Sequence, residues 1–167
     1  MSGTEITPPE SVLKLFMDAG WHPGRTVTIP ASIEATHPAF TILTSFGGLR
    51  VGQCGAGLEC ATGDVNFHYL QSSSPGIWTS LLNARLIGIA EVHDSYADLF
   101  ASSDGRIFEL SSIDNEFCLQ GLDFRSAMES ILLGKRARPM LRPDQTHVVL
   151  YGEKLTTSDP QVYHWEK

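Results

Sequence analysis

Four residues of this chain have the side-chain types of an acid–base or metal site and lie close together in the sequence: Glu91, His93, Asp94 and Asp98. Carboxylates and a histidine are groups that commonly transfer protons or bind metals in enzymes. The spacing of these four matches no catalytic signature, however, and the simpler interpretation is that they belong to an acidic surface. A tightly bound metal in the purified protein would support the enzymatic alternative.

Other enzyme motifs fail when they are read in full. Gly52, Gly55 and Gly57 have the order GxxGxG, which is not the dinucleotide fingerprint, and no Walker lysine follows a glycine-rich loop. His164 and Glu166 form the HxE of zinc deaminases, but no PCxxC follows them. The six histidines lack the spacing of metal ligands. We therefore expect no catalytic residue, no metal site and no cofactor.

The composition is that of one folded domain. The chain has 167 residues, of which 42% are hydrophobic and 19% charged, and this length is typical of a single domain. No apolar run approaches the roughly 18 residues of a membrane span, and the first residues do not resemble a signal peptide. Cys54, Cys60 and Cys118 match neither a disulfide framework nor a zinc site, which fits reduced thiols. These features predict a cytoplasmic protein.

Negative charge is concentrated in one segment of the chain. Between Leu86 and Phe124 eight acids accompany a single base, Arg106, whereas the rest of the chain has 11 acids and 11 bases. The formal net charge of −7 therefore comes entirely from this segment. We expect an acidic face there. The alternative is a solvated sheet surface that is acidic for solubility and for protection of strand edges.

Hydrophobic periodicity indicates the elements that must position these side chains. Apolar residues at helical spacing predict four helices, and the second and fourth have a favourable first residue, Pro38, and a favourable N-cap, Asp123. Glycines end the first, second and fourth patterns. The four predicted helices span residues 12–19, 38–46, 77–82 and 123–133.

Shorter apolar or alternating runs predict strands. Asp104 and Gly105 lie between two of these runs, and an Asp-Gly pair is a strong hairpin signal because both central positions can take positive φ. Helices followed by a strand-rich region and a final helix predict an α+β fold in one domain. The expected strands span residues 49–51, 65–70, 86–92, 96–102 and 106–110; residues 26–29 form a further β-rich stretch, and 148–151 form an apolar run in the tail.

Four short motifs occur in a fixed order: GWHPGR at 20–25, FGGL at 46–49, SDGRIF at 103–108, and an amphipathic segment closed by a glycine at 134. Together they resemble the SUKH superfamily of bacterial immunity proteins, and its third subfamily most closely. The residues that carry the resemblance are Gly20, Trp21, Pro23, Gly24, Arg25, Phe46, Gly47, Gly48, Leu49, Asp104, Gly105, Arg106 and Gly134. We interpret these residues as determinants of the fold, with Trp21 as a core anchor and Arg25 paired with a carboxylate or a helix end.

The resemblance implies a mixed, mostly antiparallel sheet with helices packed against it. It assigns residues 1–138 to a SUKH-like domain. Residues 139–167 then form a C-terminal extension that either adds an edge strand or remains a mobile tail.

The resemblance also implies a binding protein and not an enzyme. Immunity proteins of this superfamily neutralise polymorphic toxins, which are often nucleases or act on nucleotides, and an acidic face would be attracted to the basic groove of such a toxin. We expect a monomer that forms a 1:1 complex with its toxin and binds neither nucleic acid nor membrane directly. The alternative is a scaffold or regulatory domain related to SMI1/KNR4 that has no toxin partner. The predicted partner-binding residues are Glu91, Asp94, Asp98, Asp114, Glu116, Trp78 and Tyr96.

Overall fold

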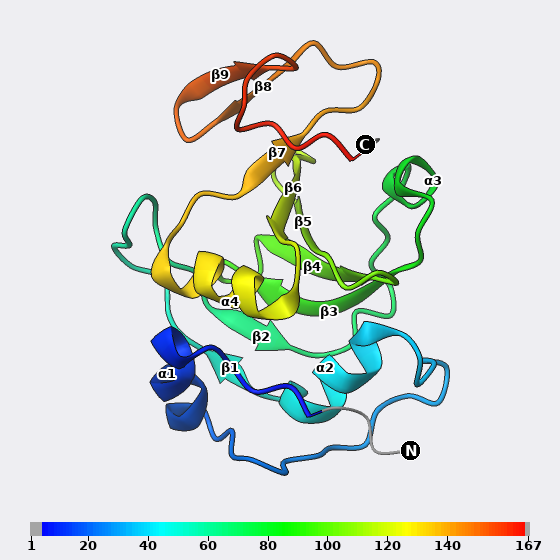
Figure 1. Cartoon of the computed structure of the whole chain (residues 1–167), viewed down its shortest axis with the longest axis vertical. Coiled ribbons are helices and arrows are strands. Elements are labelled where there is room, and N and C mark those ends of the chain that lie inside the picture. Colours follow the sequence, from blue (N-terminus) through cyan, green and yellow to red (C-terminus); the bar gives the residue numbers. More distant parts are fainter. Residues whose placement is uncertain (1–4, 166–167) are drawn as a thin grey trace.

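Seven strands form the main sheet of the computed structural model, which describes residues 5–165 (Figure 1). Each strand pairs with the next one in the chain, and every pairing is antiparallel. The expected α+β fold with a mostly antiparallel sheet is confirmed. The strands are β1 (Arg50–Val51), β2 (Val65–Phe67), β3 (Leu86–Val92), β4 (Ala97–Ser102), β5 (Ile107–Ser111), β6 (Phe117–Gly121) and β7 (Arg138–Met140).

Four α-helices accompany the sheet, at the places where the periodicity predicts them: α1 (Leu13–Asp18), α2 (Pro38–Phe46), α3 (Trp78–Leu82) and α4 (Phe124–Leu133). A short 3-10 helix, η1 (Glu10–Val12), precedes α1. Asp123 caps α4 as predicted, because its carboxylate accepts a hydrogen bond from the Ser126 backbone at 2.7 Å. Among residues 5–165 no helix has the length and apolarity needed to span a bilayer.

Apolar clusters cover both faces of the sheet. Ile107 packs in a cluster with residues from α1, α2 and α4, whereas the next residue, Phe108, packs in a cluster with α3. Successive side chains of a strand point to opposite faces, so these clusters lie on opposite sides of the sheet. We call the first side the α4 face and the second the α3 face.

The chain beyond α4 returns to the sheet and then leaves it. β7 pairs with β6, and the hairpin of β8 (His147–Leu150) and β9 (Glu153–Thr156) forms a separate small sheet beyond β7 (Figure 1). The last described residues pass back along β7, where the Tyr163 backbone donates to the Pro139 carbonyl at 2.8 Å. Glu166, predicted only as half of an accidental HxE, lies outside the described residues.

The GWHPGR motif joins α1 to the C-terminal end of α2. Trp21 is buried, with its ring 6.4 Å from that of Phe46. The Arg25 guanidinium donates to the carbonyls of Ser45 and Gly47, at 2.8 Å in each case. Because the last carbonyls of a helix have no partner within it, Arg25 satisfies groups that α2 leaves free. The expectation that Arg25 meets a helix end is therefore confirmed.

Gly134 ends α4 and lets another segment approach its backbone. Its φ of +74° is left-handed, and a Cβ added there would lie 2.3 Å from the Cys60 carbonyl oxygen and 2.7 Å from the Gly57 Cα. The backbone N–H groups of Glu59 and Cys60 both donate to the Gly134 carbonyl. Gly134 thus holds the glycine-rich loop of residues 52–63 against the end of α4.

Three details differ from the sequence expectation. Residues 26–29 form no strand, because the Val27 N–H donates to the Thr44 carbonyl of α2 and not to the sheet. In the β4–β5 turn only Gly105 has positive φ, and the Gly105 N–H donates to the Ser102 carbonyl, so the turn is a three-residue loop with a left-handed glycine. No strand was predicted at the residues of β6, β7 or β9.

Candidate functional site

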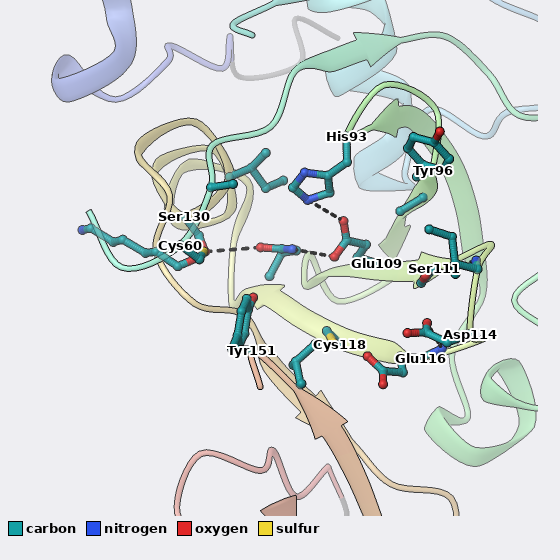
Figure 2. A pocket seen from close by; sticks show the side chains of 17 residues that line it. Cys60, His93, Tyr96, Glu109, Ser111, Asp114, Glu116, Cys118, Ser130 and Tyr151 are labelled. Atoms are coloured by element: carbon teal, nitrogen blue, oxygen red, sulfur yellow. Dashed lines mark hydrogen bonds and ion pairs between the residues drawn. The ribbon is translucent and has the colours of Figure 1, made fainter. Parts of the chain in front are cut away.

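A cavity of about 360 Å³ lies on the α4 face, next to the turns that join β3 to β4 and β5 to β6 (Figure 2). In an antiparallel meander these two turns lie at the same end of the sheet, while the β4–β5 turn lies at the other end. The C-terminal end of α4 and the loop that carries Cys60 line the cavity as well. Leu150 and Tyr151 of the β8–β9 hairpin complete its wall.

Glu109 on β5 places a carboxylate in this cavity. It points to the α4 face because it stands two residues after Ile107, and its side chain is 13% exposed. Its Oε1 lies 3.1 Å from His93 Nε2 and accepts no well-aligned hydrogen bond, so the two side chains form an ion pair when the imidazole is protonated (Figure 2). Its Oε2 accepts from Gln120 Nε2 at 2.9 Å, and Gln120 in turn accepts from the Ser130 hydroxyl of α4 at 3.2 Å. Glu109 raises the pKa of His93, although burial of the ring opposes this shift.

A strained turn carries His93 into the cavity. His93, Asp94 and Ser95 have φ values of 53°, 55° and 70°, and left-handed backbone at a non-glycine residue costs on the order of 1 kcal/mol or more. The imidazole passes close to the backbone of Gly63, where a Cβ would lie only 2.7 Å from the ring. A residue with a side chain would therefore displace His93. The sequence therefore provides both the turn and the space that His93 requires.

Asp64 fixes that turn. Its side chain is 5% exposed, accepts from the Asp94 backbone N–H at 2.7 Å and lies 3.1 Å from the guanidinium of Arg50. Burial by itself would raise the pKa of Asp64, but hydrogen bonds from Asp94 and Cys54 and the charge of Arg50 lower it overall. An ionised carboxylate thus offsets part of the strain in the β3–β4 turn.

Four residues form the outer edge of the cavity, and we call this set the rim: Tyr96, Ile113, Asp114 and Glu116. Tyr96 is 58% exposed and Ile113 is 73% exposed, which is high for large apolar side chains. Asp114 and Glu116 lie beside each other on the β5–β6 turn (Figure 2), and within residues 5–165 neither forms an ion pair with a basic side chain. Burial, and then the negative charge of Asp114, raise the pKa of Glu116 to about 7.

The predicted partner-binding residues do not all gather at this cavity. Tyr96, Asp114 and Glu116 belong to the rim, and Asp94 lies on the same turn as Tyr96. Glu91 and Asp98 pair across β3 and β4 on the α3 face, on the opposite side of the sheet. There Glu91 lies 3.1 Å from His68 Nε2, and Asp98 accepts a hydrogen bond from Ser73.

Trp78 is a core residue in the structure. It is 3% exposed and stacks on Phe117 at a ring separation of 4.6 Å, with Trp165 packed against its edge. A partner cannot reach a side chain at this depth without unfolding the α3 region. We therefore correct the prediction that Trp78 binds the partner.

The four residues that suggested acid–base chemistry do not converge. His93 points to Glu109 on the α4 face, while Glu91 and Asp98 are on the α3 face and Asp94 is exposed beside Arg50. Within the part of the chain that the structure describes, no three His, Cys, Asp or Glu residues are arranged to hold a metal ion.

The inner residues of the cavity were not predicted from the sequence. Glu109 was counted among the acids but not assigned to a site, and its contact with His93 joins strand β5 to the turn between β3 and β4. One signal was available: alternation from Ile107 places Glu109 on the buried face, which is unusual for a carboxylate. Nothing in the sequence indicated Tyr151, which reaches the cavity only because the tail folds back.

Residues 8–134 match the model of the SUKH-3 immunity protein family. The match includes both turns and ends at the C-cap of α4, so Leu150 and Tyr151 of the cavity wall lie beyond it. No curated protein and no solved structure matches the chain.

Proposed function

Because this chain belongs to the SUKH-3 immunity protein family, we propose that it neutralises a cognate bacterial toxin by binding it with the rim of the cavity. The observation that supports this surface is the pairing of two exposed apolar side chains, Tyr96 and Ile113, with the two unpaired carboxylates of Asp114 and Glu116. Aromatic residues are enriched among those that contribute most to protein interfaces. Asp94 extends the negative charge of this surface along the β3–β4 turn.

The charge of the rim favours a toxin with a basic surface. A toxin that acts on nucleic acid or nucleotides needs such a surface to hold phosphates, and the carboxylates of an immunity protein can take their place. Charge is screened over about 8 Å at physiological salt, so it guides the encounter while packing holds the complex. In this proposal Tyr96 and Ile113 supply the packing, and the protein acts in the cytoplasm as a monomer in a 1:1 complex, without a cofactor.

Co-expression with the toxin domain encoded beside the gene tests this proposal. We expect rescue of growth and co-purification of a 1:1 complex, and we expect Tyr96→Ala together with Ile113→Ala to weaken binding by at least about tenfold. If the toxin is active alone but is neither bound nor neutralised by this protein, the immunity proposal is wrong and the scaffold alternative takes its place.

The two acidic pairs provide a matched comparison. Asp114→Asn with Glu116→Gln replaces two acids of the rim, and Asp98→Asn with Glu91→Gln replaces two acids of the α3 face. We expect the rim pair to slow association at low salt and the α3-face pair to leave it within about twofold of wild type. Equal changes in the association rate for the two pairs would show that the rate depends on the net charge of the protein and not on the position of the rim acids.

A further inference from the structure

The cavity inside the rim combines apolar walls with carboxylate groups. Ala97, Ile131 and Leu150 supply apolar surface, while the carboxylate of Glu109 lies within and those of Asp114 and Glu116 lie at the edge. A volume of about 360 Å³ is at the small end of the range for ligand pockets, and it suits one long side chain better than a large ligand.

Within residues 5–165 Asp114 and Glu116 form no ion pair with a basic side chain, and Glu109 has only the imidazole of His93 as a possible cationic partner. His93 faces Glu109 alone, and the Glu109 Oε1 atom is buried without a well-formed hydrogen bond. Lys135 also lines the cavity, but it forms no ion pair with any carboxylate in the described part of the chain. Asp114 and Glu116 therefore lie beside each other with no basic side chain of the described residues paired to them, and burial, followed by the charge of Asp114, raises the pKa of Glu116.

We propose that the cavity receives a single arginine or lysine side chain of the bound toxin, so that its methylene groups pack on the apolar walls and its charged end meets Glu109 or Glu116. This inference rests on the proposed function, because the side chain comes from the toxin. An anion is disfavoured by the three carboxylates, and an apolar side chain would bury Glu116 further with no compensating charge. A long cationic side chain is the type that combines an apolar stem with a charged head.

Tyr151 and Leu150 give this subsite a wall that lies outside the family match. Tyr151 is held in place because its hydroxyl oxygen accepts from the Ala137 N–H at 2.9 Å and Arg136 stacks on its ring at 5.1 Å. The shape of the cavity therefore depends on the tail as well as on the family fold.

Binding of the neighbouring toxin domain to four forms of the full chain tests the inference: wild type, Glu116→Gln, Glu109→Gln and the control Glu91→Gln. We expect Glu116→Gln and Glu109→Gln each to weaken the complex by about tenfold or more, and we expect the affinity of the Glu91→Gln control to remain within about twofold of wild type. The thermal midpoint of each variant is measured alongside, and Glu116→Gln decides the question if Glu109→Gln does not fold. Unchanged affinity of the Glu116→Gln complex overturns the cation subsite while leaving the immunity proposal intact.

A second measurement does not need the toxin. N-acetyl-arginine amide is titrated into the 15N-labelled full chain, with N-acetyl-citrulline amide as the uncharged control of nearly equal shape. We expect saturable shifts at the amides of Glu109, Glu116 and Tyr151 with the arginine probe and shifts at least about fivefold smaller with citrulline. Equal shifts from both probes, or none from either, would contradict the inference even if the toxin binds.

Discussion

The α4 face of the sheet has two regions that differ in how completely their side chains find partners within the protein. In the first, which we call the aromatic core, the rings of Phe16, Phe46, Phe67 and Phe124 contact one another with centroid separations between 5.0 and 6.2 Å. The second is the cavity, where the same sheet presents Glu109. Helix α4 serves both, since it starts in the aromatic core and ends at the cavity with Ser130 and Ile131.

This difference separates folding from binding. Every apolar side chain of the aromatic core is paired within the protein, so its contacts stabilise the fold and leave nothing for a partner. The rim keeps exposed apolar groups and two carboxylates that have no cationic partner among residues 5–165, which is costly in isolation and favourable when a complementary surface arrives. Substitutions in the two regions should therefore change different quantities.

The largest loss of stability is expected in the aromatic core. Phe46→Ala removes a fully buried ring that touches Trp21, Phe16, Phe67 and Phe124, and we expect the free energy of unfolding to fall by about 4 kcal/mol. Urea denaturation followed by circular dichroism measures the change. A loss below about 1 kcal/mol would mean that the cluster repacks and that the contrast between the regions is smaller than the structure indicates.

Arg25→Met should have the next largest effect. The change keeps much of the apolar stem but removes both hydrogen bonds to the last turn of α2, and we expect a loss of about 2 kcal/mol in the free energy of unfolding. Arg25→Lys serves as the control: it keeps the charge but cannot bridge two carbonyls in the same way, so its loss should lie in between. Hydrogen exchange at the C-terminal end of α2 should rise in parallel.

Glu116→Gln should stabilise the protein, and only at high pH. The folded protein holds the Glu116 proton up to about pH 7, whereas the unfolded chain releases it near the ordinary value of 4.5. This group therefore supports folding fully below about pH 4.5, and that contribution is lost as the pH rises through 7.

At pH 8 the substitution should raise the free energy of unfolding by about 1 kcal/mol, which is less than the full shift implies because solvent screens the site. At pH 4 wild type and variant should unfold alike. The measurement is a pair of urea curves at each pH, with Glu91→Gln on the α3 face as the reference. A loss of stability at pH 8 would mean that Glu116 has a stabilising partner within the protein.

Tyr96→Ala should change stability least. The side chain is 58% exposed and its ring contacts no other aromatic ring among residues 5–165, so the free energy of unfolding should stay within about 0.5 kcal/mol of wild type. Its effect is expected in toxin binding instead, as described above. A large destabilisation would place Tyr96 with the aromatic core and remove it from the rim.

Much of the fold could be predicted because its signals are local. Asp123 and Gly134 bound α4 in the sequence as they do in the structure, and Pro38 starts α2. Predictions that depended on residues distant in the sequence were wrong. Residues 26–29 have strand-forming side chains, but the Val27 N–H donates to a carbonyl of α2. Trp78 was predicted to bind a partner, but Trp165, 87 residues later in the chain, packs against it. Capping is decided within a few residues, whereas burial and pairing are decided by what packs alongside.

The sequence by itself determined the family, the positions of the glycines and of the arginine that build its fold, and the concentration of negative charge between Leu86 and Phe124. Only the tertiary structure decided how that charge is divided: antiparallel pairing sends Glu91 and Asp98 to one face, Glu109 to the other, and Asp114 and Glu116 to the rim. The physical reason is that side chains alternate across a strand and that turns alternate between the ends of a meander. Residues close in sequence are thus separated, while His93, Glu109 and Tyr151 are brought together.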